Sequence, residues 1–497
     1  MPVISYREHK AAWFRERLLR RHASAFHLWA LGVGAVISGD FFGWNFGFVA
    51  GGFGGLLAAL ALMTALYIGL CFSLAELSAA LPHTGGAYSF ARASMGPWGG
   101  YITGLAENME YIFTPATIVV GIGGYLSAIF KTPPAYEVVW WVVCYAVFVF
   151  LNIWGVEMSF RVSAITTISA LAVLAVFYGG ALPQVDLQRW AFAGRPFLLK
   201  GWPGLFAALP FALWMYLGIE QLPLAAEETR QPERDMPRGI FWSLGTLIVC
   251  SVLTLVLSGG IAPGAEKVGE SSEPLFLGFQ TIFGSGIGSR LLALCAVTGL
   301  IASFHAIIYA YGRQIYSLSR AGYFPEWLSQ THRSRRTPHR ALVAGSLLGL
   351  GAAIGIRLSG PAGPVGAILL NMAVFGAVLA YVLQMASFIL LRRNAPGLVR
   401  PYVSPLGIPG AAAAAALAVI TLAALFANHD YRVGVWGAAV WFACGVAYFA
   451  LYARRRLILS PEEQFALSLA PKATVAGPSS PMRAGKSDSD TAKETAL

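Results

Sequence analysis

The chain carries few charged residues. Asp, Glu, Lys and Arg make up only 12% of its 497 residues, whereas 57% are hydrophobic. An ordinary soluble chain has about 25% charged residues, so this composition excludes a soluble globular protein. Apolar runs long enough to cross about 30 Å of hydrocarbon recur along the sequence, and they do not alternate apolar and polar residues as membrane β-barrel strands do. The composition therefore predicts an all-α integral membrane protein.

Cysteine is also scarce. The sequence has five cysteines, which lie inside apolar runs at Cys71, Cys144, Cys250, Cys295 and Cys444. They show neither the spacing of metal ligands nor a disulfide framework, and a role as small buried hydrophobes explains them. We therefore expect no metal ion and no other cofactor.

Motifs that would indicate other classes of function are missing from the sequence. It contains no Gly-x-x-x-x-Gly-Lys-Ser/Thr loop, so we expect no ATP-driven motor. It has no cluster of His, Asp and Glu with metal-ligand spacing, which argues against an enzyme. A sensor would usually carry a soluble output domain, and the polar ends are short. The net charge of +11 does not indicate a nucleic-acid partner, because the basic residues gather between the apolar runs.

Twelve apolar runs predict twelve membrane-spanning helices. They cover residues 26–48, 54–80, 99–129, 138–155, 162–182, 204–225, 239–261, 289–319, 341–358, 364–391, 408–427 and 433–453. Residues 26–391 hold the first ten spans, and residues 408–453 hold the last two. Residues 1–25 form an N-terminal segment. Residues 458–497 are polar and rich in Ser, Pro, Lys and Ala, so they should be a disordered tail.

Basic residues are distributed unevenly among the connecting segments. With the N-terminus in the cytoplasm, the inner segments up to Arg456 hold 22 Lys and Arg residues, and the outer segments hold eight. Inner loops of membrane proteins carry such an excess. The distribution predicts a multi-pass protein of the cytoplasmic membrane with both termini in the cytoplasm.

The first and sixth spans are interrupted in the middle, and each interruption carries an acid. Glycines surround Asp40, and glycine and proline surround Glu220. A carboxylate at bilayer depth costs about 2.5–3.5 kcal/mol even on lenient scales. Gly and Pro let a helix unwind and free backbone groups for a ligand. Because the interruptions lie five spans apart, we expect two five-helix repeats of opposite orientation, followed by two extra helices. Paired broken helices with acids indicate a transporter for a small cation.

Four stretches resemble, in order and spacing, the amino acid–polyamine–organocation permeases. They are residues 32–39; residues 75–77 with 81–88; residues 216–220 with 225–237; and Arg313 with residues 319–325, 337–339 and 400–402. Within this superfamily the chain is most similar to the ethanolamine permeases, through residues 37–45, 107–111 and 114–116. The resemblance implies secondary transport of ethanolamine across the lipid bilayer by alternating access.

The resemblance also implies a substrate site at the two broken helices. Its expected members are Ile37, Ser38, Gly39, Asp40, Glu110, Trp214, Tyr216, Leu217, Gly218 and Glu220. In amino-acid members of the superfamily, backbone N–H groups at the first break hold the substrate carboxylate, as a helix N-terminus binds an anion. Asp40 can occupy that anion position, where it would repel a carboxylate and attract an ammonium. The alternative is that Asp40 only caps the second half-helix.

Two further members of this site have alternative interpretations. Glu220 is a second anion for the ammonium or a proton-accepting gate, unless freed backbone amides simply satisfy it. Trp214 matches the position at which relatives place an aromatic ring over the substrate, where a cation–π contact would suit an ammonium. A lone aromatic in a span is, however, more often part of the core.

Two acids lie together in the third span. Glu107 and Glu110 are one helical turn apart and share a face. Packing alone does not explain such a pair inside a membrane. One acid would pair with Arg313 or His305, or be held protonated by its neighbour. We expect Glu107 to act as a cytoplasmic-side gate and Glu110 to contribute to the pocket.

The coupling ion stays open between a proton and sodium. His305 in span eight is a proton relay or a hydrogen-bonded helix contact. Ser303 can coordinate sodium together with carbonyls of span one. Span five, residues 162–182, lacks the lysine that some proton-coupled relatives use.

The sequence as a whole predicts a permease that imports ethanolamine or a similar small primary amine. The alternative within the superfamily is an amino acid or polyamine permease or antiporter. The alternative from another class is a membrane-embedded sensor or enzyme.

Overall fold

The structure is a computed structural model that describes residues 4–271, 273–284, 286–359, 365–427 and 432–469. Within these residues, eleven helices are long and apolar enough to cross a membrane. The first predicted span is also helical and apolar, but at Ala25–Phe41 it is shorter than the other eleven. The prediction of an all-α membrane protein is confirmed.

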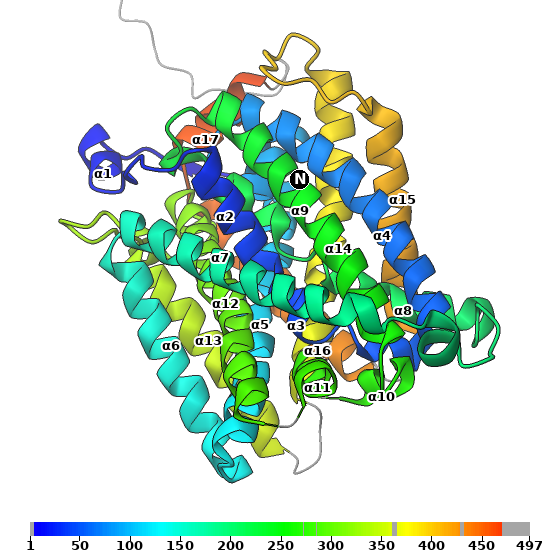
Figure 1. The fold of residues 1–497 in the computed structure, drawn as a ribbon. Coiled ribbons are helices and arrows are strands. Elements are labelled where there is room, and N and C mark those ends of the chain that lie inside the picture. The colour runs from blue at the N-terminus through cyan, green and yellow to red at the C-terminus, as the bar shows by residue number, and fades with distance from the viewer. Residues whose placement is uncertain (1–3, 272, 285, 360–364, 428–431, 470–497) are drawn as a thin grey trace, which may run out of the picture.

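The long helices follow one another with mostly short connections (Figure 1). They are α4 (Phe46–Ala80), α5 (Gly86–Phe130), α6 (Glu137–Trp154), α7 (Val156–Ala181), α8 (Gly201–Trp214), α9 (Pro232–Gly260), α12 (Ile287–Arg320), α13 (His339–Ser359), α14 (Val365–Asn394), α15 (Gly407–Ala427) and α16 (Arg432–Leu451). Helix α8 reaches full membrane length only together with η4 (Ile219–Glu228), a 3₁₀-helix that follows a break.

Shorter elements complete the fold. They are β1 (Tyr6–Arg7), α1 (Ala11–Arg15), α2 (Ala25–Val36), α3 (Ser38–Phe41), η1 (Pro134–Tyr136), η2 (Leu182–Gln184), η3 (Leu187–Phe192), α10 (Ala265–Glu270), α11 (Pro274–Phe283), η5 (Glu326–Ser329), η7 (Ala453–Arg455), β2 (Leu457–Ile458) and α17 (Pro461–Leu469). Helix α4 bends at Gly52, whose φ of +73° lies in the left-handed region that favours glycine. The bend separates the end of the first predicted span from the second span.

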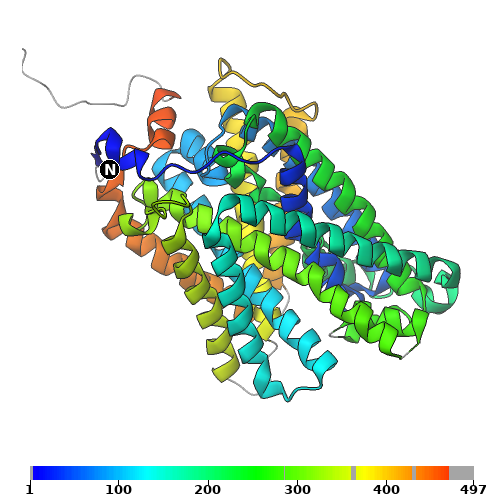
Figure 2. The same ribbon diagram turned by 60° about the vertical axis from the view of Figure 1, so that its left-hand side comes forward.

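Helices α2 and α3 lie inside the bundle. Helix α2 packs against α7, α9 and α12, and α3 packs against α12. Both views show this dark-blue segment running through the middle of the molecule, with the green α9 and the teal α7 beside it (Figures 1 and 2). Helix α5 packs against α12 and α14 on the other side of the core. The first break is therefore surrounded by protein, where free backbone groups can find partners.

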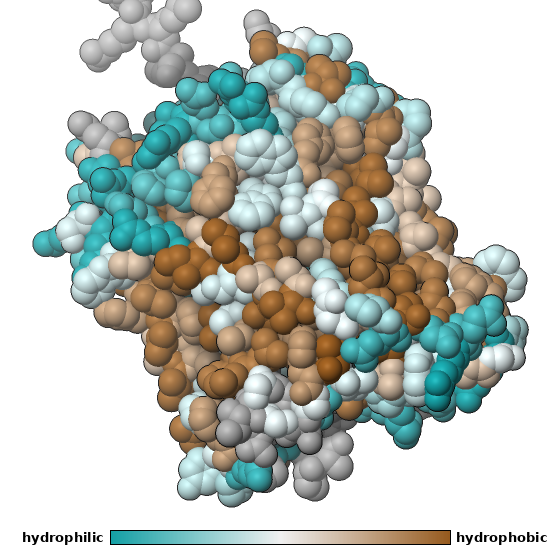
Figure 3. All heavy atoms as spheres, viewed as in Figure 1, coloured by the Kyte–Doolittle hydropathy of each residue, from teal (hydrophilic) through white to brown (hydrophobic). Residues whose placement is uncertain are grey.

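The outer surface has an apolar band. Hydrophobic residues fill the middle of the face drawn in Figure 3, and hydrophilic residues gather at its upper left and lower right. Large apolar side chains such as Val249, Ile165 and Leu347 are exposed on this surface. Exposed apolar side chains over a wide area suit contact with lipid.

The segments around Tyr6 and Leu457, near the two ends of the described residues, meet on one face, which we call the terminal face. Strand β1 pairs with β2 in parallel, with Tyr6 opposite Leu457. The predicted disordered tail is wrong for residues 458–469, because β2 and α17 are ordered there. Residues 470–497 of that prediction lie outside the described residues.

Buried ion pairs explain why this part of the tail is ordered. The Glu463 carboxylate lies 2.6 Å from Arg92 Nε and accepts a 2.9 Å hydrogen bond from the Tyr323 hydroxyl. Burial raises the pKa of the Glu463 carboxyl, and the Arg92 charge acts in the opposite direction. The neighbouring Glu462 forms an ion pair with Arg320. Composition predicted disorder because it does not show that two acids meet buried arginines.

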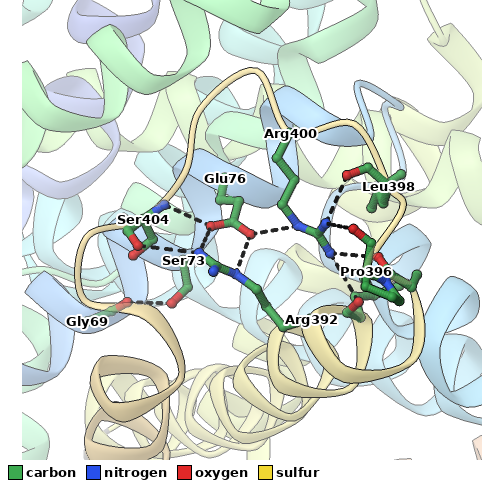
Figure 4. Close-up of polar contacts among 10 residues, drawn as sticks. Gly69, Ser73, Glu76, Arg392, Pro396, Leu398, Arg400 and Ser404 are labelled. Atoms are coloured by element: carbon green, nitrogen blue, oxygen red, sulfur yellow. Dashed lines mark hydrogen bonds and ion pairs between the residues drawn. The ribbon is translucent and has the colours of Figure 1, made fainter.

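A second ion cluster joins α4 to the end of α14. Glu76 Oε1 lies 2.8 Å from Arg392 Nε and 3.0 Å from Arg400 Nε (Figure 4). The Ser404 N–H donates to the other Glu76 oxygen at 2.8 Å. Arg400 also donates to the Leu398 carbonyl at 2.8 Å, so it holds the loop after α14 in place. Two of the stretches that carry the family resemblance, residues 75–77 and 400–402, thus meet in this ion cluster.

Candidate functional site

The first span is broken on both sides of a single helical turn. Helix α2 ends at Val36, and Ser38–Phe41 forms the turn α3 before Phe42 becomes extended. The expectation that the interruption itself carries Asp40 is wrong. Asp40 lies inside α3, because the Phe42 N–H still donates to the Ser38 carbonyl at 3.0 Å.

The sixth span breaks between α8 and η4. Helix α8 ends at Trp214, and Gly218 adopts a φ of +113° before η4 begins at Ile219. The Gly218 N–H donates to both carboxylate oxygens of Glu220, at 2.9 and 3.1 Å. A freed amide therefore does satisfy Glu220, as one of the two interpretations predicted.

The two breaks touch each other through their backbones. A Cβ atom at Gly39 would lie 2.7 Å from the Trp214 carbonyl oxygen, so only glycine fits there. At Gly218, a Cβ atom would lie 3.4 Å from the Ala35 carbonyl oxygen. The Trp214 indole N–H donates to the Phe42 carbonyl at 2.9 Å, which places this ring against the first break. The structure thus brings the predicted members of both breaks together.

Glu110 and Glu220 form a buried acid pair. Their carboxyl groups lie close enough to interact electrostatically, and both side chains are shielded from solvent. The Tyr381 hydroxyl lies near Glu220 and 2.9 Å from the Tyr67 hydroxyl. Among the described residues, no Lys, Arg or His forms an ion pair with either acid. Two ionised carboxylates repel each other strongly when both are buried, and a proton shared between them relieves that repulsion.

Asp40 lies apart from this pair. Its side chain is 1% exposed and lies beside Thr254 of α9, with Tyr178 of α7 nearby. In the part of the chain that the structure describes, no basic side chain pairs with it. The structure does not show the predicted capping role, because Asn45 precedes α4 and Asp40 makes no capping hydrogen bond.

Asn45 is a member of the break that the sequence did not single out. Its side-chain amide donates to the Val268 and Ser271 carbonyls at 2.9 and 2.8 Å, and its oxygen accepts from the Gly43 N–H at 3.2 Å. These bonds tie the first break to α10 and the segment after it. The only available signal was its place at the end of residues 37–45.

Glu107 has different partners from those predicted. Its Oε2 accepts a hydrogen bond from Gln314 Nε2 at 2.7 Å, and its Oε1 lies 3.4 Å from the Tyr111 hydroxyl. The expectation that Glu107 or Glu110 pairs with Arg313 or His305 is wrong. Both basic groups are already engaged elsewhere.

His305 and Ser303 join helices. His305 Nδ1 lies 3.1 Å from Asn152 Nδ2, and Nε2 lies 3.1 Å from the Ser159 carbonyl oxygen. A neutral imidazole satisfies both contacts, which favours the helix-contact interpretation. The Ser303 hydroxyl donates to the Gly34 carbonyl at 2.7 Å and accepts from the Ser38 N–H at 2.9 Å. Ser303 thereby fastens α12 to the first break.

Tyr216 also has a structural partner on each side. Its hydroxyl lies 2.7 Å from Thr64 Oγ1 and 2.8 Å from Ser251 Oγ. Leu217, the residue after it, is buried within the break. These two predicted members therefore shape the wall of the site, and the Tyr216 hydroxyl is not free in this conformation.

Two ion pairs join the end of η4, which follows the second break, to α12 at the terminal face. Arg313 Nη2 lies 3.0 Å from Glu228 Oε1, and both side chains are fully buried. Arg320 Nη1 lies 2.9 Å from Glu227 Oε2. Glu227 and Glu228 end η4, whereas Arg313 and Arg320 lie two turns apart on α12. These two acids and two arginines all belong to the stretches that carry the resemblance, but nothing in the sequence indicated that they pair.

A bundle with two adjoining broken helices and buried acids at the breaks defines a membrane permease. The amino acid permease family model matches residues 24–450, and the chain belongs to this family of transporters. It is 30% identical over 402 residues to an uncharacterized transporter, R00093, of Rhizobium meliloti (strain 1021), covering 79% of this chain and 83% of the relative.

Two further relatives come from Bacillus subtilis (strain 168). The branched-chain amino acid permease BcaP is 28% identical over 468 residues, covering 90% of this chain and 96% of the relative. The methylthioribose transporter is 25% identical over 482 residues, covering 90% of this chain and 97% of the relative. The chain is accordingly a multi-pass membrane transporter.

Proposed function

We propose that this permease is a secondary-active transporter that imports ethanolamine or a similarly small primary amine across the cytoplasmic membrane. The carrying observation is that Asp40, Glu110 and Glu220 lie buried at the two breaks with no basic side chain paired to them among the described residues. Buried carboxylates need a counter-charge or a proton. A substrate ammonium supplies the counter-charge.

Asp40 is the proposed ammonium partner. It lies at the first break, where the Ser38 N–H is already used by Ser303. A substrate carboxylate arriving there would lose this donor and would face the Asp40 charge. A short amine with a hydroxyl group meets neither obstacle. The indole of Trp214 lies against the same break and offers an aromatic face for the cation.

The Glu110–Glu220 pair is the proposed proton-coupling group. Two neighbouring buried carboxyls are stabilised by sharing one proton, so loss of that proton would drive them apart. Because Glu220 is held by the Gly218 N–H, this movement acts directly on the second break. Sodium at Ser303 is the weaker alternative, because the Ser303 hydroxyl already bridges Gly34 and Ser38.

Alternating access then requires the ion pairs of the terminal face to separate. Glu227 and Glu228 belong to η4 and move with the second break, whereas Arg313 and Arg320 belong to α12. Opening toward the terminal face would part η4 from α12 and expose the site on that side. We expect the five-plus-five inverted repeat to relate this motion to the opening of the opposite face.

An amino acid is the second candidate substrate. It is favoured by the relative BcaP, whose name describes branched-chain amino acid transport and which aligns over 90% of this chain. A branched-chain amino acid carries the carboxylate that Asp40 would repel. The two candidates therefore predict opposite results in a competition experiment.

Uptake into vesicles that contain only this protein tests the proposal. Labelled ethanolamine should accumulate when an inward proton gradient is imposed, and an inward sodium gradient should have no such effect. Unlabelled ethanolamine should compete, whereas leucine, serine and a diamine should not. Accumulation of labelled leucine without ethanolamine uptake would establish the second candidate instead.

A further inference from the structure

The loop before α13 has a defined conformation on the terminal face. The His332 N–H donates to the Thr337 carbonyl at 2.8 Å, and the Arg336 N–H donates to the His332 carbonyl at 2.8 Å. The Thr337 hydroxyl donates to the Ile153 carbonyl at 2.9 Å, and Thr331 donates to the Glu16 carbonyl at 2.7 Å. The loop is thus fastened to α6 and to the N-terminal segment.

This loop lines a basic cavity of about 830 Å³. Arg333, Arg336 and Arg340 line it together with His332 and His339. Glu16 is the one acid among the lining residues, and its side chain is 78% exposed. Within the described residues, none of the three arginines forms an ion pair. Three guanidiniums around one cavity without a carboxylate partner favour an anionic ligand.

A helix terminus adds to the positive potential of the cavity. Helix α13 begins at His339 and runs for 21 residues, and its first residues His339 and Arg340 line the cavity. The positive end of its dipole therefore lies at the cavity, where the His339 N–H donates to the Thr337 carbonyl at 2.9 Å. Residues 337–339 belong to the stretches that carry the family resemblance, and the transport site makes no use of them.

Two exposed tryptophans place the cavity at headgroup depth. Trp327 is 54% exposed, and its carbonyl lies 3.5 Å from Arg340 Nη1. Trp154 is 47% exposed at the end of α6, and the guanidinium of Arg335, in the same loop, lies 4.1 Å from its ring centroid. Tryptophans gather where a membrane protein meets the phospholipid headgroups.

We propose that this cavity binds a phosphate group carried by an anionic phospholipid of the adjacent leaflet. Basic pockets at the ends of membrane helices recognise such headgroups through several charge-assisted hydrogen bonds. Free inorganic phosphate shares the same chemistry and is the other source that the experiment must separate. The site stands independently of the transported substrate.

Lipid retention by the purified full chain tests the site. The protein in detergent is mixed with phosphatidylglycerol or phosphatidylcholine, and retained lipid is counted by native mass spectrometry. The test variant combines Arg333→Gln, Arg336→Gln and Arg340→Gln. The matched control combines Arg238→Gln, Arg393→Gln and Arg455→Gln, three exposed arginines near the same face that do not line the cavity.

The wild type and the control should retain phosphatidylglycerol in preference to phosphatidylcholine, and the test variant should retain at least tenfold less. The unfolding temperature in lipid-free detergent should be the same for all three proteins, which separates binding from folding. Retention of inorganic phosphate without phosphatidylglycerol would assign the cavity to the free anion. Equal loss in both variants, no loss in the test variant, or equal retention of the two lipids would overturn the proposal.

Discussion

At the scale of single residues, the buried carboxyls differ in what surrounds them. Glu107 has an amide partner and Glu220 has a backbone amide, whereas Asp40 lies beside Thr254 with no basic partner among the described residues. The proposed roles follow these differences. Asp40 is expected to meet the substrate, and Glu110 with Glu220 to hold the proton.

The first prediction concerns Asp40→Asn. Because an ion pair supplies most of the directional binding of so small a substrate, ethanolamine uptake should fall about tenfold or more, on the scale of 1.4 kcal/mol per decade. Competition by serine should become stronger, because the like charge is removed. Asp186→Asn is the matched control, since this exposed residue caps a short helix far from the breaks. Near-normal uptake and selectivity in Asp40→Asn, with normal surface expression, would rule out the counter-ion role.

The second prediction concerns the acid pair. Glu110→Gln removes the group that shares a proton with Glu220, so ethanolamine uptake should lose most of its dependence on external pH. Glu107→Gln should keep the wild-type pH profile, because its amide can still accept the Gln314 hydrogen bond. Uptake measured from about pH 5 to about pH 8 compares the two variants. A pH profile that Glu110→Gln leaves unchanged would assign coupling elsewhere.

At the scale of elements, η4 and α12 are joined by two ion pairs that differ in burial. Glu228 and Arg313 are completely buried and have each other as their charged partner among the described residues. Glu227 is 21% exposed, and its partner Arg320 also pairs with Glu462 of α17. Removing Glu228 therefore leaves Arg313 without a charged partner, whereas removing Glu227 leaves Arg320 paired with Glu462.

The third prediction follows from this difference. Glu228→Ala leaves the Arg313 charge buried without a partner and should lower the free energy of unfolding by about 3–5 kcal/mol. Glu227→Ala should cost about 1 kcal/mol, because Arg320 keeps Glu462. Denaturation of the purified protein in detergent measures both values. Equal losses in the two single variants would contradict the assigned partners.

A double variant extends the same test to α17. Once Glu227 is replaced, Glu462→Ala should cost more than it does in the wild-type background, because Arg320 then has no acid left among the partners seen in the structure. Additive losses would show that α17 and η4 do not share Arg320. The comparison also reports whether the ordered part of the tail is docked in solution.

At the scale of the whole molecule, the parallel pairing of β1 with β2 brings the first and last described segments together on the terminal face. The cavity before α13 lies on that face, and it is lined by Arg333, Arg336 and Arg340 of a predicted inner segment. This arrangement is consistent with the predicted topology, in which the terminal face is cytoplasmic. The orientation itself is open to a direct experiment.

The fourth prediction concerns this orientation. In a background with Cys295 and Cys444 replaced by serine, a cysteine at Ser334 should react with a membrane-impermeant reagent only after the cells are opened. A cysteine at Lys267, which is exposed on α10, should react in intact cells. Labelling of the Ser334 position in intact cells would show that the topology is the reverse of the predicted one. The proposed lipid site would then lie in the outer leaflet.

The sequence alone determined the membrane class and which two spans are broken. Low charge and long apolar runs indicate a bundle of membrane-spanning helices. In lipid the backbone N–H and C=O groups have no water to bond, and an α-helix satisfies them within itself. Gly39 and Gly218 marked the breaks, since their backbones approach other backbones too closely for a side chain. Local chemistry of this kind is visible in a linear sequence.

Only the tertiary structure decided which charges meet. Glu110 and Glu220 are 110 positions apart by their numbers, and Glu228 meets Arg313 across another gap of 85 residues. Such contacts depend on how the helices pack, which residue type and spacing do not reveal. The same reason explains the tail, where Glu463 is polar in composition but becomes ordered once Arg92 and Tyr323 surround it. Burial next to an opposite charge, which packing creates, converts a segment that looks disordered into part of the fold.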